Sequence, residues 1–162
     1  MTKVEIENLD TGLSEKVREQ ISSILFKLLS DEFVTYVKAR NYHWNIVGPH
    51  FKELHEFFQK IYEELNDEID EIAERIRALG LKVPATMKNF LNETTLTETN
   101  DFLKDEDMLK SLLNDYEATI KNIREYISIA SSNKDEATAN YLSDLIQKKE
   151  KTAWMIRSTI EK

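Results

Sequence analysis

The chain has 162 residues, no cysteine and a formal net charge of −8, from 22 basic and 30 acidic residues. The lack of cysteine excludes a disulfide framework, a thiolate zinc site and an iron–sulfur cluster. Three glycines and two prolines are too few for a loop-rich or all-β fold, and the frequent Glu, Lys, Leu, Ile and Ala favour helices. We therefore expect one all-α domain over residues 1–162.

Hydropathy and charge also bear on location and partners. No apolar run approaches the ~18 residues of a membrane span, and the N-terminus lacks a basic region followed by an apolar stretch. We expect a soluble, cytoplasmic protein with no membrane partner. The first fourteen residues contain one base, Lys3, so this acidic chain has no basic patch there that would attract nucleic acid.

Two long helices are predicted in the N-terminal half. The first covers residues 14–41, where Ser14 suits the N-cap and apolar residues recur at spacings of three and four. The second covers residues 49–79, with Pro49 in its first turn and Gly80 at the position that ends a helix. Both helices carry an apolar stripe, as expected of helices that pack against a core.

Two more long helices are predicted after a connection of residues 81–104, which is too long for a tight turn and includes a short helix at about residues 85–91. They cover residues 105–131 and 134–160. Four such helices, with one long crossover between the second and third, describe a ferritin-like four-helix bundle. A coiled-coil dimer is the competing fold, but the apolar stripes are wider than its seam.

Histidines and carboxylates are the residues most informative about function. All three histidines fall between His43 and His55, and Asp70 and Glu74 follow on the same predicted helix. At a rise of ~1.5 Å per residue, His55 and Asp70 lie ~22 Å apart along that helix, whereas a metal ligand must lie ~2 Å from the ion. Either these residues are unrelated, or histidines of one subunit share a site with carboxylates of another.

The ordinary metal site within one bundle is excluded by the histidine positions. Di-iron bundles take Glu-x-x-His motifs from two of their four helices, but no histidine follows His55 and the residue three before it is Lys52. A site between subunits is geometrically natural. If two copies of the second helix pack antiparallel about a two-fold axis near residues 62–63, position 55 of one faces position 70 of the other.

Ordinary structural explanations are also open for these residues. The acids between residues 63 and 74 are typical of a solvated helix face, on which Glu71 and Arg75 have the spacing of an ion pair. A histidine near a helix junction is more often a surface or capping residue, and Trp44 is more often a packing residue than a redox one. Spacing alone leaves both explanations open.

An ordered set of motifs runs through the second predicted helix and the turn before it: His43-Trp44-Asn45-x-x-Gly48-x-x-Phe51, Leu54-His55-Glu56, Asp70-Glu71-Ile72-Ala73-Glu74-Arg75-Ile76 and Leu79-Gly80. This set resembles the signature of the Dps family, the DNA-binding proteins from starved cells, which are also called mini-ferritins. The helix lengths, the crossover and a late Trp154-Met155 also fit that family. The resemblance therefore covers nearly the whole chain.

The resemblance implies an assembly and an activity. Members form a hollow dodecameric shell with ferroxidase sites at two-fold interfaces, oxidise Fe(II) there, preferentially with hydrogen peroxide, and store ferric mineral inside, which protects the cell from hydroxyl radical. By matching position, the resemblance implies that His43 and His55 of one subunit bind iron together with Asp70 and Glu74 of the partner subunit. It also implies that Trp44 lies near the iron and absorbs oxidising equivalents.

One position departs from the family pattern. The family usually carries an aspartate four residues after the second histidine, where this chain has Gln59. Because a neutral amide is a poorer ligand for a hard cation than a carboxylate, we expect the second iron position to be weak, filled transiently, or completed by water or Glu63. Gln59 also leaves open that iron oxidation is slower, or that the site prefers zinc.

Three functions are therefore compared. The first is a peroxide-consuming ferroxidase and iron store. The second is an architectural DNA binder, which we do not expect because DNA-coating members typically use lysine-rich tails and this chain is acidic. The third is a shell impaired by Gln59, with a structural, immune-interacting or metal-binding role. The acids Asp135, Glu136 and Asp144 resemble the region that lines the family's three-fold pores, although capping and the helix dipole explain acids there equally.

Overall fold

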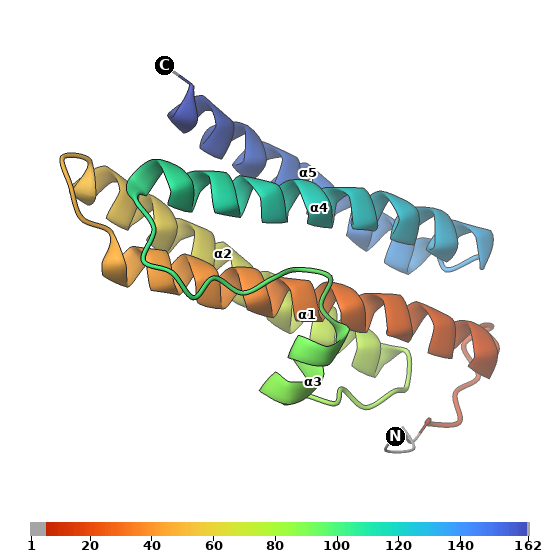
Figure 1. Cartoon of the computed structure of the whole chain (residues 1–162). Coiled ribbons are helices and arrows are strands. Elements are labelled where there is room, and N and C mark those ends of the chain that lie inside the picture. Colours follow the sequence, from red (N-terminus) through yellow and green to blue (C-terminus); the bar gives the residue numbers. More distant parts are fainter. Residues whose placement is uncertain (1–5, 162) are drawn as a thin grey trace.

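Four long helices and one short helix make up the fold (Figure 1). The computed structural model describes residues 6–161, so Lys3 lies outside the described residues. The elements are α1 (Glu15–Asn45), α2 (Phe51–Ala78), α3 (Met87–Glu93), α4 (Asp105–Ser132) and α5 (Glu136–Ile160). The predicted all-α fold is confirmed. Among residues 6–161, no helix is both long and apolar enough to cross a membrane.

The bundle consists of two antiparallel helix pairs, α1 with α2 and α4 with α5 (Figure 1). The crossover between α2 and α4 carries α3 and runs back along α1, so α2 and α4 point the same way. Pro49 and His50 of the α1–α2 loop line one cavity with Asp105 and Ile160. That loop, the start of α4 and the end of α5 therefore share one end of the bundle, and the predicted long crossover with a short helix is confirmed.

Local sequence signals begin and end these helices. The Ser14 hydroxyl caps α1 by accepting a hydrogen bond from the Val17 amide at 3.3 Å. After α2, Gly80 has a φ of +84°, a left-handed conformation that favours glycine at a helix end. The end of α1 differs from the prediction, because the helix continues through Asn45. His43 therefore lies in the last turn of α1 and not beyond it.

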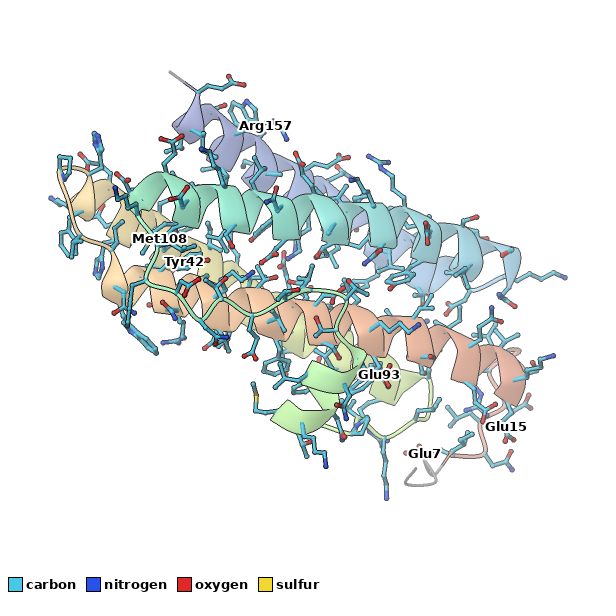
Figure 2. All side chains as sticks on the ribbon, viewed as in Figure 1. Glu7, Glu15, Tyr42, Glu93, Met108 and Arg157 are labelled. Atoms are coloured by element: carbon cyan, nitrogen blue, oxygen red, sulfur yellow. The ribbon has the colours of Figure 1, made fainter. Side chains whose placement is uncertain are left out.

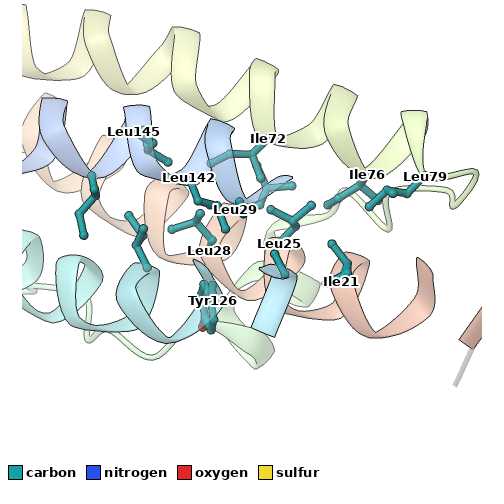
Figure 3. Close-up of a cluster of buried hydrophobic side chains, with 14 of the residues drawn as sticks. Ile21, Leu25, Leu28, Leu29, Ile72, Ile76, Leu79, Tyr126, Leu142 and Leu145 are labelled. Carbon is teal, nitrogen blue, oxygen red and sulfur yellow. The ribbon is translucent and has the colours of Figure 1, made fainter. Parts of the chain in front are cut away.

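Two apolar clusters form the core, one toward each end of the bundle. The first brings together side chains of all four long helices, as Figure 3 shows: Ile21, Leu25, Leu28, Leu29, Ile72, Ile76, Tyr126, Leu142 and Leu145. The second includes Tyr42, Phe58 and Met108, and Figure 2 places the labelled Tyr42 and Met108 toward the α1–α2 loop. Burial of these side chains supplies the main driving force for folding.

Three buried charged residues lie between the two clusters along α1, α2 and α5. They are Glu32, Glu68 and Lys149, here called the core triad, and each is at most 5% exposed. Charged groups are rarely buried in this way unless they are paired, because removing an ion from water costs several kcal/mol. The triad satisfies that requirement with two ion pairs centred on Lys149.

A buried carboxylate, Asp31 of α1, holds the crossover in position. Its Oδ1 accepts hydrogen bonds from the Thr94 hydroxyl at 2.7 Å and the Thr95 amide at 2.6 Å, and its Oδ2 accepts from the Thr95 hydroxyl at 2.9 Å. Asn122 of α4 adds a longer contact of 3.4 Å to Oδ2. Because hydrogen bonds to a charged acceptor are the strong ones, this group fixes the path of the chain between α3 and α4.

Candidate metal centre

His43 and His55 face each other where α1 and α2 approach the connecting loop. Their rings stack with centroids 3.7 Å apart and 21° between the planes. Nδ1 of each ring donates a hydrogen bond of 2.8 Å to the backbone carbonyl oxygen of the other histidine. Since a carbonyl oxygen only accepts, each Nδ1 carries a proton, and in the neutral form of each imidazole the lone pair is on Nε2. This tautomer is the one in which an imidazole can bind a metal ion through Nε2.

The short α1–α2 loop produces this pairing. Ile46 is buried and its amide donates to the Tyr42 carbonyl at 2.9 Å, which closes the end of α1. Gly48 then takes a φ of +124°, which L side chains rarely adopt, and its carbonyl accepts from the Phe51 amide at 3.1 Å. The chain reverses in a few residues, so the last turn of α1 lies beside the second turn of α2.

Aromatic rings and one cation surround the histidine pair. Tyr62 meets His43 edge-on with centroids 5.2 Å apart, and Phe51 stacks on His55 at 5.1 Å. The Arg40 guanidinium lies 4.2 Å from the centre of the Tyr62 ring and 6.0 Å from that of Trp44. Such cation–π contacts hold rings in fixed orientations.

Sequence reasoning missed Arg40 and Tyr62. The available signal was helical spacing, because Arg40 lies one turn before His43 and Tyr62 lies two turns after His55. These spacings occur throughout helical sequences, so they did not distinguish the two residues from their neighbours.

Asp70 and Glu74 lie on the same continuous helix as His55 and are exposed. Among residues 6–161, no group of three or more potential metal-ligating side chains comes close enough to hold an ion. The structure thus brings together the two predicted histidine ligands and keeps both predicted carboxylates away from them, as the ~22 Å helical separation requires. That all four residues bind one metal ion stays a prediction, and it requires two subunits to share the site.

Gln59 lies one turn after His55 on α2. Its Nε2 donates a hydrogen bond of 2.7 Å to Oε1 of Glu63. The amide nitrogen is therefore directed to the acid that we considered as a substitute ligand, and the Gln59 Oε1 atom is the one suited to a cation.

The acids at the start of α5 have structural roles that sequence reasoning only partly anticipated. Asp135 is buried, caps α5 by accepting from the Thr138 amide at 3.1 Å, and forms an ion pair of 2.9 Å with Arg75. The expected pairing of Arg75 with Glu71 is wrong, because the described ion pair of Arg75 crosses to α5. Glu136 and Asp144 are exposed, and the pore assignment stays a prediction.

The fold and the comparisons with known proteins first define the class. The family model of the ferritin-like domain matches residues 23–162. Dps from Vibrio cholerae O1, described as a member of a broad superfamily of ferritin-like diiron-carboxylate proteins, superposes with a TM-score of 0.91 at 30% sequence identity. The match covers 99% of this chain and all of that one. The predicted ferritin-like fold is confirmed.

Comparison with relatives of similar sequence identifies the family within this class. DNA protection during starvation protein 2 of Bacillus anthracis is 37% identical over 142 residues, covering 88% of this chain and 97% of the relative. A low temperature-induced protein of Nostoc sp. is 36% identical over 155 residues, covering 94% of this chain and 87% of the relative. The chain belongs to the Dps family of ferritin-like proteins.

Proposed function

We propose that this chain is a mini-ferritin that oxidises Fe(II) with hydrogen peroxide and stores the ferric product in a shell of twelve copies. The observation that carries the proposal is the His43–His55 pair. Two imidazoles, each fixed by a hydrogen bond from Nδ1 to a backbone carbonyl, leave their Nε2 atoms as the ligand positions at the end of the helix pair. Such preorganised nitrogen ligands suit a divalent transition metal ion.

The carboxylates of this site come from a second copy in our proposal. An antiparallel packing of two α2 helices about a two-fold axis brings Asp70 and Glu74 of the partner subunit to the histidines. Two carboxylates balance the charge of a divalent ion and favour the harder Fe(III) product. Asp70 and Glu74 repel each other by roughly 0.2–0.5 kcal/mol at this spacing when unpaired, and a bound cation reverses that repulsion.

Exposed apolar side chains around the histidines support an interface there. Trp44 is 67% exposed, Val47 79% and Phe51 46%, and all three lie in the last turn of α1, the loop or the first turn of α2. Apolar side chains gathered on a surface mark sites of association. A second copy that covers them also shields the histidines from water, and we propose Trp44, which follows His43 in the sequence, as the residue that donates an electron to the site.

The proposed reaction consumes two Fe(II) ions for each peroxide. Each Fe(II) gives one electron, the O–O bond breaks, and two protons are taken up to form two water molecules. No hydroxyl radical is released because both electrons reach the same peroxide. Iron is the metal we propose, since the Vibrio cholerae relative is described as a diiron-carboxylate protein, and no comparable observation favours zinc.

A second candidate function, a shell with impaired oxidation, has one observation in its favour. Gln59 stands where a carboxylate would strengthen the second iron position, and its amide nitrogen is bound to Glu63. In that case two Fe(II) ions do not meet at one site. Each iron then reacts singly with peroxide and releases radical.

The deciding experiment loads purified, metal-free protein with Fe(II) under anaerobic conditions and adds stoichiometric peroxide, with ferric absorbance and radical trapping followed together. We expect rapid oxidation without trapped radical. Slow oxidation with radical would establish the impaired shell instead.

A variant pair separates the site from the scaffold. His55→Ala combined with Glu74→Ala should abolish fast oxidation while size-exclusion chromatography still shows the assembled shell. His50→Ala is the matched control, because His50 is exposed and makes no side-chain cap hydrogen bond; it should oxidise iron at the wild-type rate. Wild-type oxidation by the double variant would show that the interface site is wrong.

A further inference from the structure

The bundle centre carries a second group of ligand-type side chains, the core triad, which the proposed interface site does not use. Lys149 Nζ lies 2.5 Å from Oε2 of Glu32 and 2.7 Å from Oε2 of Glu68. Its ammonium also lies 5.0 Å from the centre of the Tyr116 ring. Side chains of α1, α2 and α4 thus converge on the buried ammonium of Lys149 from α5.

The side chains at the bundle centre differ from the ligand set of an ordinary di-iron bundle. Di-iron bundles hold their ions at the bundle centre with carboxylates and histidines from all four helices. Here two of the helices still supply buried carboxylates, Glu32 and Glu68, but α5 supplies an ammonium and α4 a phenol ring. The residues present do not fit a di-iron centre, and the cation between the carboxylates is Lys149.

The triad places one ammonium between two buried carboxyl groups. Oε1 of Glu32 is buried, and no hydrogen-bond partner for it lies among the described residues. Burial raises the pKa of Glu32 to about 7, although Lys149 opposes the shift. Burial disfavours the Lys149 ammonium, but Glu32 and Glu68 outweigh that effect and raise the pKa of Lys149. One ammonium therefore lies between two buried carboxyl groups, and one oxygen of Glu32 has no hydrogen-bond partner among the described residues.

The carboxylates are also close to a route from the surface. A cavity of about 260 Å³ lies between α2 and α5. Its polar lining consists of three acids, three lysines and one hydroxyl: Glu64, Asp67, Glu68, Lys60, Lys148, Lys151 and Thr152. The Thr152 hydroxyl donates to Oε2 of Glu64 at 3.4 Å. The cavity thus extends to Glu68, and its three lysines offset the charge of its three acids.

We propose that Lys149 Nζ occupies the cation position of a bundle-centre site for a divalent transition metal ion, and that this ammonium keeps such ions out of the bundle. Removing the ammonium leaves two buried carboxylates, Glu32 and Glu68, with the spare Oε1 of Glu32 and a path for entry. The inference does not depend on the interface site, because Glu68 is buried against Lys149 of α5, whereas Asp70 and Glu74 of the same helix are exposed.

The test replaces Lys149 with glutamine in the full chain and uses Co(II) alone as the probe. The background is His55→Ala with Glu74→Ala, which removes the proposed interface ligands. We expect Lys149→Gln to bind about one Co(II) per chain more than its parent, with a visible d–d absorption band. Co(II) should also raise its unfolding temperature.

Lys38→Gln in the same background is the matched control. Lys38, on α1, is buried like Lys149. Its ammonium pairs with one carboxylate, that of Asp115, at 2.6 Å. Its removal does not leave two carboxylates that shared one ammonium, so we expect no added Co(II). Adding Glu32→Gln to the Lys149→Gln chain should abolish the extra binding.

The outcomes are decisive even if Lys149→Gln is unstable. A chain that folds only when Co(II) is present supports the proposal, because the ion then replaces the ammonium. A folded Lys149→Gln chain with no extra Co(II), or one that Co(II) does not rescue, overturns it. Lys149→His, which supplies an imidazole beside the same carboxylates, must likewise gain Co(II), and its failure to do so overturns the proposal.

Discussion

Replacing Asp31 with asparagine should loosen the crossover without changing its shape. The amide can keep its oxygen toward the Thr94 hydroxyl and the Thr95 amide, but its NH₂ group then faces Asn122, which is also a donor. Hydrogen bonds to a charged acceptor contribute about 1.5–3 kcal/mol each and neutral ones about 0.5–1.5 kcal/mol. Two retained bonds therefore lose about 2–3 kcal/mol together, and relief of the buried charge offsets part of this.

A net loss of about 1–3 kcal/mol predicts a measurable local opening. Hydrogen exchange of the Thr95 amide, whose N–H bonds directly to Asp31, should accelerate roughly 5- to 150-fold in Asp31→Asn. Amides in the middle of α1 and α2 should keep their protection, because the change affects only the crossover.

Glu98→Gln is the control for the lost charge, since Glu98 is an exposed acid on the same crossover. It should leave Thr95 exchange unchanged. If Thr95 exchanges equally slowly in Asp31→Asn and in the wild-type chain, then apolar packing holds the crossover and the reasoning about Asp31 is wrong.

Four further predictions concern the metal site, the core and nucleic acid. Gln59→Asp should tighten binding of a second Fe(II) per site in anaerobic titrations, and an unchanged isotherm would mean that another group already supplies that ligand. Infrared spectra should show one carboxylic acid C=O band that titrates at about pH 7 and is absent from Glu32→Gln, because burial raises the pKa of Glu32 to about 7, with Glu68 and Asp31 adding to the shift and Lys149 opposing it. Since this pKa is raised from 4.5, the contribution of Glu32 to the free energy of unfolding is full below about pH 4.5 and is lost as the pH rises through about 7; a pH dependence of stability identical in Glu32→Gln would contradict this. Metal-free protein should not shift duplex DNA at ~0.15 M salt, since an acidic surface repels phosphate; a shifted band would show a basic surface that the net charge conceals.

The order and type of the long helices could be predicted because apolar spacing and end signals agree. Ser14 and Gly80 mark helix ends by local chemistry, and both predictions are confirmed. The end of α1 was misplaced because nothing local stops the helix at residue 41, while the buried Ile46 and the left-handed Gly48 fix the reversal further on.

The candidate site was predictable in residue type but not in detail. The proximity of His43 and His55 followed from a short turn between two helices. Their reciprocal bonds to each other's carbonyls could not be inferred, because they depend on the relative rotation of α1 and α2. Lys149 and Glu32 are separated by 117 residues, and no local pattern indicates that they meet.

The core triad also restricts how the helices can slide past one another. The apolar clusters on either side of it consist largely of leucine and isoleucine, which pack acceptably in more than one axial position. A shift of α5 by one turn, ~5.4 Å, moves Lys149 away from both Glu32 and Glu68. Separating one partner from a buried ion pair costs about 3–5 kcal/mol, comparable to much of the stability of a domain. The three side chains of the core triad therefore favour a single axial alignment of the helices. A surface formed by several helices has the same shape in every copy of the chain only if that alignment is the same in every copy.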